Sequence, residues 1–127
     1  MREGAKKAGR DAGDLDMMIE VKVSFDTDLE RAMADTTQWA ALALPGEQKV
    51  GVHDPREMER LGSALTSQQT ASRWIVSTDP EEVTERVGAY FAMGFNHLLV
   101  HGPGPDQQRF IQLFAKEVMP GLRARYA

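Results

Sequence analysis

The pattern of hydrophobic positions predicts two strands separated by a long helical segment. Between Met18 and Phe25, polar and apolar residues alternate, with Ile19, Val21, Val23 and Phe25 on one face. This alternation is typical of a strand that packs on one side only. A second apolar run covers residues 95–101 and ends at a glycine-proline loop. We therefore expect strands over 18–25 and 95–101, and a mostly helical insertion over 27–78 between them.

The helix predicted over residues 79–93 has the clearest local signals. Asp79 suits the N-cap and Pro80 the first helical position, while Gly94 suits the residue that ends a helix. Because this helix leads directly into the strand at 95–101, the two form half of a parallel α/β repeat. A further helix is predicted over 105–119, with Pro120 bending or restarting it.

Weaker patterns divide the insertion into shorter helices. Residues 28–43 favour a helix that Pro45-Gly46 ends. Its expected inner face consists of Leu29, Met33, Thr36, Thr37 and Ala40. Another helix is predicted from Asp54 to about Ala64, and a less marked one over 66–73. Residues 1–9 resemble the last turns of a helix.

Composition and charge narrow the function classes. The chain has 127 residues and a net charge of −4, which argues against a nucleic-acid footprint. It has no cysteine, which excludes a disulfide framework and a thiolate metal site. No apolar run reaches the roughly 20 residues of a membrane-spanning helix, and no apolar stretch follows the basic amino terminus as in a secretory signal. We expect a cytoplasmic protein without nucleic-acid or membrane partners.

Candidate ligand-binding residues cluster around the second strand. The loop from Gly102 to Pro105 resembles a phosphate-binding loop, but its two prolines remove amide donors, so a simple turn is favoured. His97 and His101 are four residues apart, which on a strand is roughly 13 Å, too far to share a metal ion. His101 lies at the carboxyl end of its strand, where barrel active sites are built, although a packing or hydrogen-bonding role is favoured over a substrate contact.

Four charged residues have two interpretations each. Glu20 and Lys22 project from one face of the first strand, where they are either solvated or, inside a barrel, must satisfy each other or a ligand. Lys49 lies in an expected loop and Arg73 precedes Trp74, positions that usually hold surface charges. A converging lysine and arginine would nevertheless suit a phosphate group.

Several stretches together resemble the carboxyl-terminal part of the F420-dependent glucose-6-phosphate dehydrogenases, a branch of the luciferase-like TIM-barrel superfamily. The resemblance covers essentially the whole chain but only a little over the last third of such an enzyme. The residues that carry it are Met18–Asp26, Glu47–Lys49, Asp54-Pro55, Glu57–Glu59, Arg73–Val76, Asp79-Pro80, Asn96–Leu98, Asp106-Gln107 and Arg109-Phe110.

This resemblance implies an α/β fold, the carboxyl-terminal portion of a luciferase-like (β/α)8 barrel within a single domain, 1–127. Strands 18–25 and 95–101 would be the seventh and eighth, with Glu20 and Lys22 pointing into the lumen. Lys49 and Arg73 would bind the substrate phosphate. The implied parent reaction transfers hydride from glucose 6-phosphate to the deazaflavin of coenzyme F420, in a homodimer. No catalytic or cofactor residue is assigned, because the family's segments for those roles precede Met1, and no metal site is expected.

Two other functions remain open. The chain could belong to a luciferase-like flavin or F420 oxidoreductase with another substrate, in which Lys49 and Arg73 bind a different anion. It could also be a truncated, non-catalytic assembly module that folds only with a missing amino-terminal barrel segment. Whether the chain by itself is an enzyme is left open, and we expect the isolated chain to be inactive.

Overall fold

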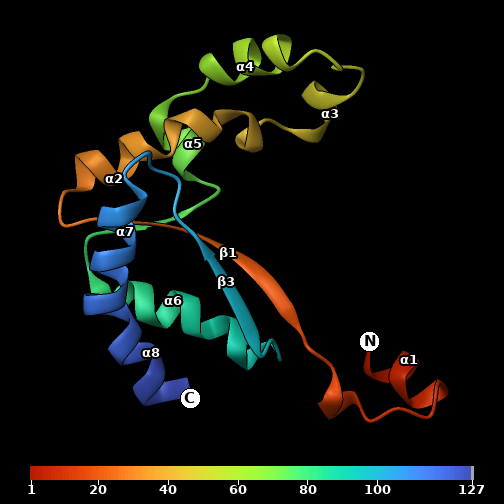
Figure 1. The fold of residues 1–127 in the computed structure, drawn as a ribbon. Helices are drawn as coiled ribbons and strands as arrows, with labels where there is room; N and C mark the ends of the chain where they lie inside the picture. The colour runs from red at the N-terminus through yellow and green to blue at the C-terminus, as the bar shows by residue number, and fades with distance from the viewer. Residues whose placement is uncertain (127) are drawn as a thin grey trace.

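A computed structural model describes residues 1–126, which form a three-stranded parallel sheet with helices on one face and across one end (Figure 1). The strands are β1 (Met18–Phe25), β2 (Ile75–Ser77) and β3 (His97–His101). Their order is β2-β1-β3, so β1 is central. The predicted α/β class with parallel strands is confirmed.

The expectation of only two strands is wrong, since β2 lies inside the predicted helical insertion at 27–78. Its three residues pair with the last three of β1, from Val23 with Ile75 to Phe25 with Ser77. β3 pairs with the first five, from Met18 with His97 to Lys22 with His101. Three residues are too few to show a periodicity, so the pairing with β1 decides the conformation of β2.

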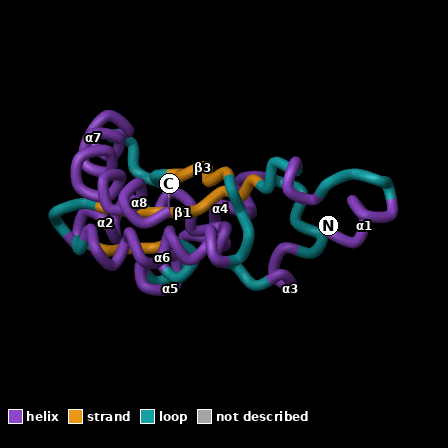
Figure 2. Tube along the Cα trace, turned by 90° about the horizontal axis from the view of Figure 1, so that it is seen from below, coloured by secondary structure: helices purple, strands orange, loops and turns teal. Residues whose placement is uncertain are grey.

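One face of the sheet is covered by the helices of the second half of the chain (Figure 2). These are α6 (Pro80–Ala92), α7 (Gln107–Leu113), the π-helical segment η3 (Phe114–Val118) and α8 (Met119–Tyr126). The α6 helix has the predicted N-cap, with the Asp79 carboxylate accepting from the Glu81 amide. The buried core consists of Val21, Val23, Phe25, Ile75, Val83, Val87, Phe114, Val118 and Leu122.

The carboxyl-terminal helix continues past residue 119, where the prediction ended. Pro120 has no backbone N–H, and its ring would crowd the carbonyl of Lys116 in a regular α-helix. The π-helical turn at Phe114–Val118 lies directly before it. A wider turn of this kind accommodates the proline, so the helix carries on to Tyr126.

The insertion crosses the carboxyl ends of the strands (Figure 1). It contains α2 (Leu29–Asp35), η2 (Thr37–Ala43), α3 (Gly46–Lys49), α4 (Pro55–Ser63) and α5 (Ser67–Ala71). The predicted inner face of the first helix was partly wrong, because Leu29 is 55% exposed whereas Ala32, Thr36 and Ala40 are buried. The predicted single helix is divided into α2 and the 3-10 helix η2, which has a kink at Trp39, so residues 28–43 do not share one α-helical face.

The amino-terminal segment lies apart from this body (Figure 2). It consists of α1 (Arg2–Lys7) and the 3-10 turn η1 (Ala12–Asp14), which pack mainly on each other. None of the helices within residues 1–126 combines the length and the apolar character needed to cross a bilayer.

Candidate functional site

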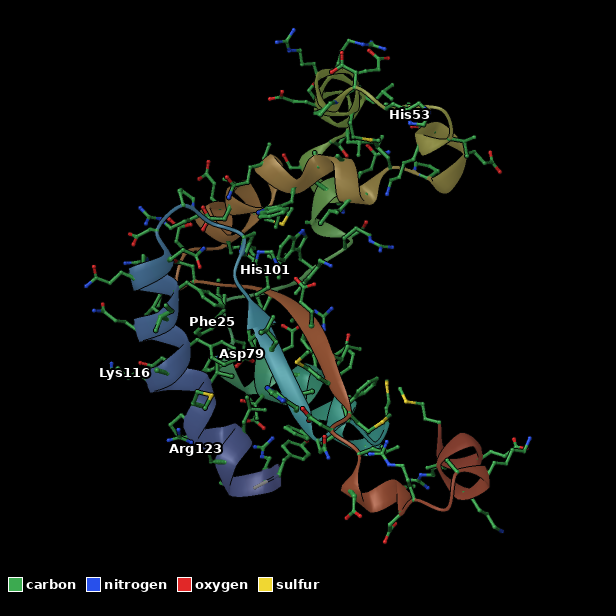
Figure 3. The ribbon with its side chains drawn as sticks, turned by 45° about the vertical axis from the view of Figure 1, so that its right-hand side comes forward. Phe25, His53, Asp79, His101, Lys116 and Arg123 are labelled. Carbon is green, nitrogen blue, oxygen red and sulfur yellow. The ribbon has the colours of Figure 1, made fainter. Side chains whose placement is uncertain are left out.

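A chain of polar contacts lies on the sheet face that the helices of the second half leave open. The Glu20 Oε1 atom is 2.6 Å from His101 Nδ1, and Glu20 Oε2 is 3.8 Å from Lys22 Nζ. Val21, Val23 and Phe25 point to the opposite, buried face, because side chains alternate along a strand. Glu20 and Lys22 therefore lie on the sheet face opposite these helices, partly exposed and in contact with each other. Figure 3 shows His101 at the end of β3, facing the insertion helices.

Two tryptophans from the insertion enclose His101. The ring centroids of Trp39 and Trp74 lie 4.9 and 5.3 Å from that of His101, both edge-to-face. Trp39 is held by a hydrogen bond of 3.0 Å from its Nε1 to the Pro103 carbonyl, which also accepts from Gln38 Nε2. Trp74 is 4% exposed, and its Nε1 has no hydrogen-bond partner within residues 1–126. These two indoles were not predicted as site residues.

Arg73 lies at the border of this cluster. It is exposed and lines a cavity of about 310 Å³ together with Glu20, Lys22, Trp74 and Arg86. The cavity borders β1 at Glu20 and Lys22, just before the residues of β1 that pair with β2. The cations beside Arg73 are therefore Lys22 and Arg86.

Lys49 occupies a different position. It ends the short helix α3, and its Nζ donates a 3.1 Å hydrogen bond to the Leu42 carbonyl. Lys49 is not among the residues that line the cavity of about 310 Å³ beside Arg73. The two residues expected to bind phosphate both lie on the insertion, Lys49 at the end of α3 and Arg73 just before β2.

A second polar group lies between α2 and α7, at the carboxyl ends of β1 and β3. Asp26 is almost fully buried and receives a bidentate pair from Arg109, with Nε at 2.7 Å and Nη2 at 2.9 Å. The hydrogen bonds from Arg109 lower the pKa of Asp26 to about 2, although burial opposes this shift. Burial raises the pKa of Asp35, which lines the same cavity of about 280 Å³.

The glycine-proline loop after β3 has a packing role in the structure. A Cβ atom on Gly102 would lie 2.5 Å from the Phe110 ring, and one on Gly104 would overlap the Asp35 carboxylate. The Pro103 carbonyl faces Trp39, as described above. The glycines therefore allow close approach of side chains, consistent with the turn that the sequence favoured over a phosphate cradle.

His97 does not join the cluster around His101. Its Nδ1 atom lies 3.2 Å from an Asp16 carboxylate oxygen at the opposite end of β3, and both side chains are more than half exposed. Among residues 1–126, no three His, Asp or Glu side chains are arranged to hold a metal ion.

The open sheet face provides one wall of a larger site. Glu20, His97 and Leu99 on this face are exposed, so no described segment lies opposite them. A small-molecule site buries most of its ligand's surface, so this face alone does not complete one.

Parallel strands with helices covering one face and polar side chains at the carboxyl ends are typical of a segment of an α/β barrel. The family model for luciferase-like monooxygenases matches residues 1–97. The chain belongs to this family, and the predicted luciferase-like barrel class is confirmed.

Similar proteins agree with this assignment. The chain is 56% identical over 124 residues to an F420-dependent glucose-6-phosphate dehydrogenase from Nakamurella multipartita and 55% identical over 125 residues to one from Beutenbergia cavernae. Each match covers 98% of this chain, which spans only 37% of the length of those relatives. A solved F420-dependent secondary alcohol dehydrogenase, in complex with an F420-acetone adduct, superposes with a TM-score of 0.75 at 28% identity. That match covers 96% of this chain and 37% of the other.

Proposed function

We propose that this chain forms the carboxyl-terminal part of an F420-dependent oxidoreductase that transfers hydride from glucose 6-phosphate to the deazaflavin. The observation that carries the proposal is the 55–56% identity, across nearly the whole chain, to relatives named for that activity. Coenzyme F420 and a sugar phosphate are then the ligands of the complete protein, and the remaining barrel strands come from a segment outside this chain.

Within that protein, Lys49 and Arg73 bind the substrate phosphate. Arg73 is exposed just before β2, in a cavity that Lys22 and Arg86 also line, where an anion would be attracted. Lys49 uses one of its three donors on the Leu42 carbonyl, which leaves two for a ligand. The complete protein is a homodimer in this proposal.

A full-length chimera tests the assignment. In it, this chain replaces the matching 37% of the Nakamurella multipartita enzyme. Lys49→Ala and Arg73→Ala should each raise KM for glucose 6-phosphate by a factor that corresponds to about 1.5–3 kcal/mol, because each removes one charge-assisted contact. The affinity for F420 should stay nearly constant. Equal weakening of substrate and coenzyme would contradict the assignment.

The structural similarity to a secondary alcohol dehydrogenase favours a second candidate, an F420 oxidoreductase of another substrate. The same chimera separates the two candidates when it is assayed with glucose 6-phosphate and with simple secondary alcohols. Turnover of the alcohols without turnover of glucose 6-phosphate would support the second candidate. In that case Lys49 and Arg73 would bind another anion.

A further inference from the structure

The polar chain on the open sheet face has unused hydrogen-bonding capacity. His101 Nδ1 must donate to Glu20, because a carboxylate only accepts, so in the neutral ring Nε2 is left as an acceptor. The 3.8 Å between Glu20 Oε2 and Lys22 Nζ is an ion pair but too long for a direct hydrogen bond. The side chains of His101, Lys22 and Glu20 are 26%, 30% and 44% exposed, so a ligand can reach them.

An unpartnered donor lies beside these groups. Trp74 lines the same cavity as Glu20, Lys22 and Arg73, and its Nε1–H is buried without a hydrogen bond in the described part of the chain. A buried donor without a partner is unfavourable, and most such groups in folded proteins find one. The cavity, at about 310 Å³, is within the size range of small-molecule sites.

The mixture of groups indicates the class of ligand. A sugar ring presents adjacent hydroxyls, each of which both donates and accepts, together with apolar C–H faces. Glu20 accepts, Lys22 donates, and the indole of Trp39, which is 36% exposed, supplies an apolar surface. Arg73, at the border of the same cavity, adds a cation suited to a phosphate.

We propose that Glu20 and Lys22 bind the hydroxyl groups of the substrate's sugar ring, beside the phosphate held by Arg73, and that His101 orients the Glu20 carboxylate for this contact. This inference rests on the proposed sugar-phosphate substrate, and it assigns to β1 and β3 a role in specificity. Glu20 accepts hydrogen bonds from the sugar hydroxyls, Lys22 donates to them, and His101 holds the Glu20 carboxylate in place. Lys49 and Arg73 on the insertion then bind the phosphate group of the substrate, and side chains on β1 and β3 recognise its sugar ring.

The test measures binding to the chimera without turnover, by the fluorescence of its tryptophans and by isothermal titration, for glucose 6-phosphate and for inorganic phosphate. Glu20→Gln should weaken glucose 6-phosphate at least about tenfold, because a charged acceptor is lost, while the Kd of inorganic phosphate changes less than about twofold. Lys22→Met should behave in the same way. Arg73→Ala should weaken both ligands, and Glu85→Gln, on the exposed face of α6, should change neither.

Each outcome decides a different question. If Glu20→Gln and Lys22→Met leave the affinity for glucose 6-phosphate unchanged, or weaken both ligands equally, the ring-binding role is overturned while the proposed function stands. If the unsubstituted chimera binds glucose 6-phosphate no more tightly than inorganic phosphate, both proposals fail. A melting temperature for each variant identifies misfolding, and Lys22→Met decides the case if Glu20→Gln does not fold.

Discussion

Two aspartates in the cavity between α2 and α7 have pKa values shifted in opposite directions. Arg109 holds the pKa of Asp26 at about 2, below its ordinary value of 3.8. Asp35 has no bidentate arginine partner in the described residues, and burial raises its pKa above 3.8. The two carboxyl groups share one cavity, so the difference is due to the bidentate guanidinium on one of them.

Asp26→Asn is expected to cost about 2 kcal/mol of unfolding free energy at neutral pH, since the shift from 3.8 to about 2 corresponds to that amount. A lowered folded-state pKa stabilises the fold above the unfolded value and loses this contribution as pH falls. The difference between wild type and variant should therefore close between about pH 4 and pH 2. Urea unfolding of both proteins from pH 2 to 7 measures it.

Asp35→Asn is the matched control, with the opposite sign. A raised folded-state pKa means that the ionised carboxylate destabilises the fold once the pH exceeds 3.8. This variant should be more stable than wild type at pH 7 and equal to it in strong acid. A loss of stability at pH 7 in both variants would show that the substitutions act through packing and not through charge.

At the scale of elements, close backbone contact between α4 and η2 holds the insertion together. A Cβ on Gly62 would lie 2.9 Å from the backbone nitrogen of Ala41 and 3.3 Å from the Ala40 carbonyl carbon. Backbone atoms cannot rotate away as a side chain can, so the two segments would have to separate. Gly62 is therefore the point where α4 is fixed over the carboxyl ends of the strands.

Gly62→Ala should lower the unfolding free energy by about 1–3 kcal/mol, as overpacking typically does. Gly46→Ala, in α3 of the same insertion, has no atom within 4 Å of the added Cβ and serves as the control. It should be neutral or slightly stabilising, because alanine restricts the unfolded chain. Denaturant titrations of the two variants compare them, and similar losses in both would refute the backbone contact as the cause.

For the molecule as a whole, the sheet has open surfaces. The edge of β3 away from β1 is unpaired in residues 1–126, and Met18 and Leu99 on the uncovered face are 58% and 51% exposed. Unpaired strand edges and exposed apolar side chains favour association with another chain. The isolated chain of 127 residues should therefore self-associate.

Leu99→Lys should reduce this association, because it places a charge on the uncovered face without touching the core on the other side. Size-exclusion chromatography with light scattering, over a range of concentrations, measures the apparent mass. Ala115→Lys, on the exposed side of η3, is the control for added charge alone. An equal fall in apparent mass for both variants would indicate general repulsion and not the open sheet face.

The elements that could be predicted from sequence depend on neighbouring residues. β1 was correct to the residue, and α6 within one residue at each end, because alternation along Met18–Phe25 and the Asp79-Pro80 cap are local signals. The polar residues Glu20, Lys22 and His101 were also identified from their strand positions. Their contacts were not, since they depend on the register of β1 against β3.

Tertiary structure alone decided the rest. Asp26 and Arg109 are 83 residues apart, and Trp39 reaches the Pro103 carbonyl across 64 residues. β2 forms where its backbone pairs with the end of β1, and the two indoles reach His101 from positions 39 and 74, far from it in sequence. Local periodicity carries no information about such contacts, because each depends on where the insertion returns to the sheet. By itself, the sequence determined β1, the cap of α6 and the polar candidates on the strands, because these depend on neighbouring residues, whereas the crossing of the insertion determined β2 and which side chains meet.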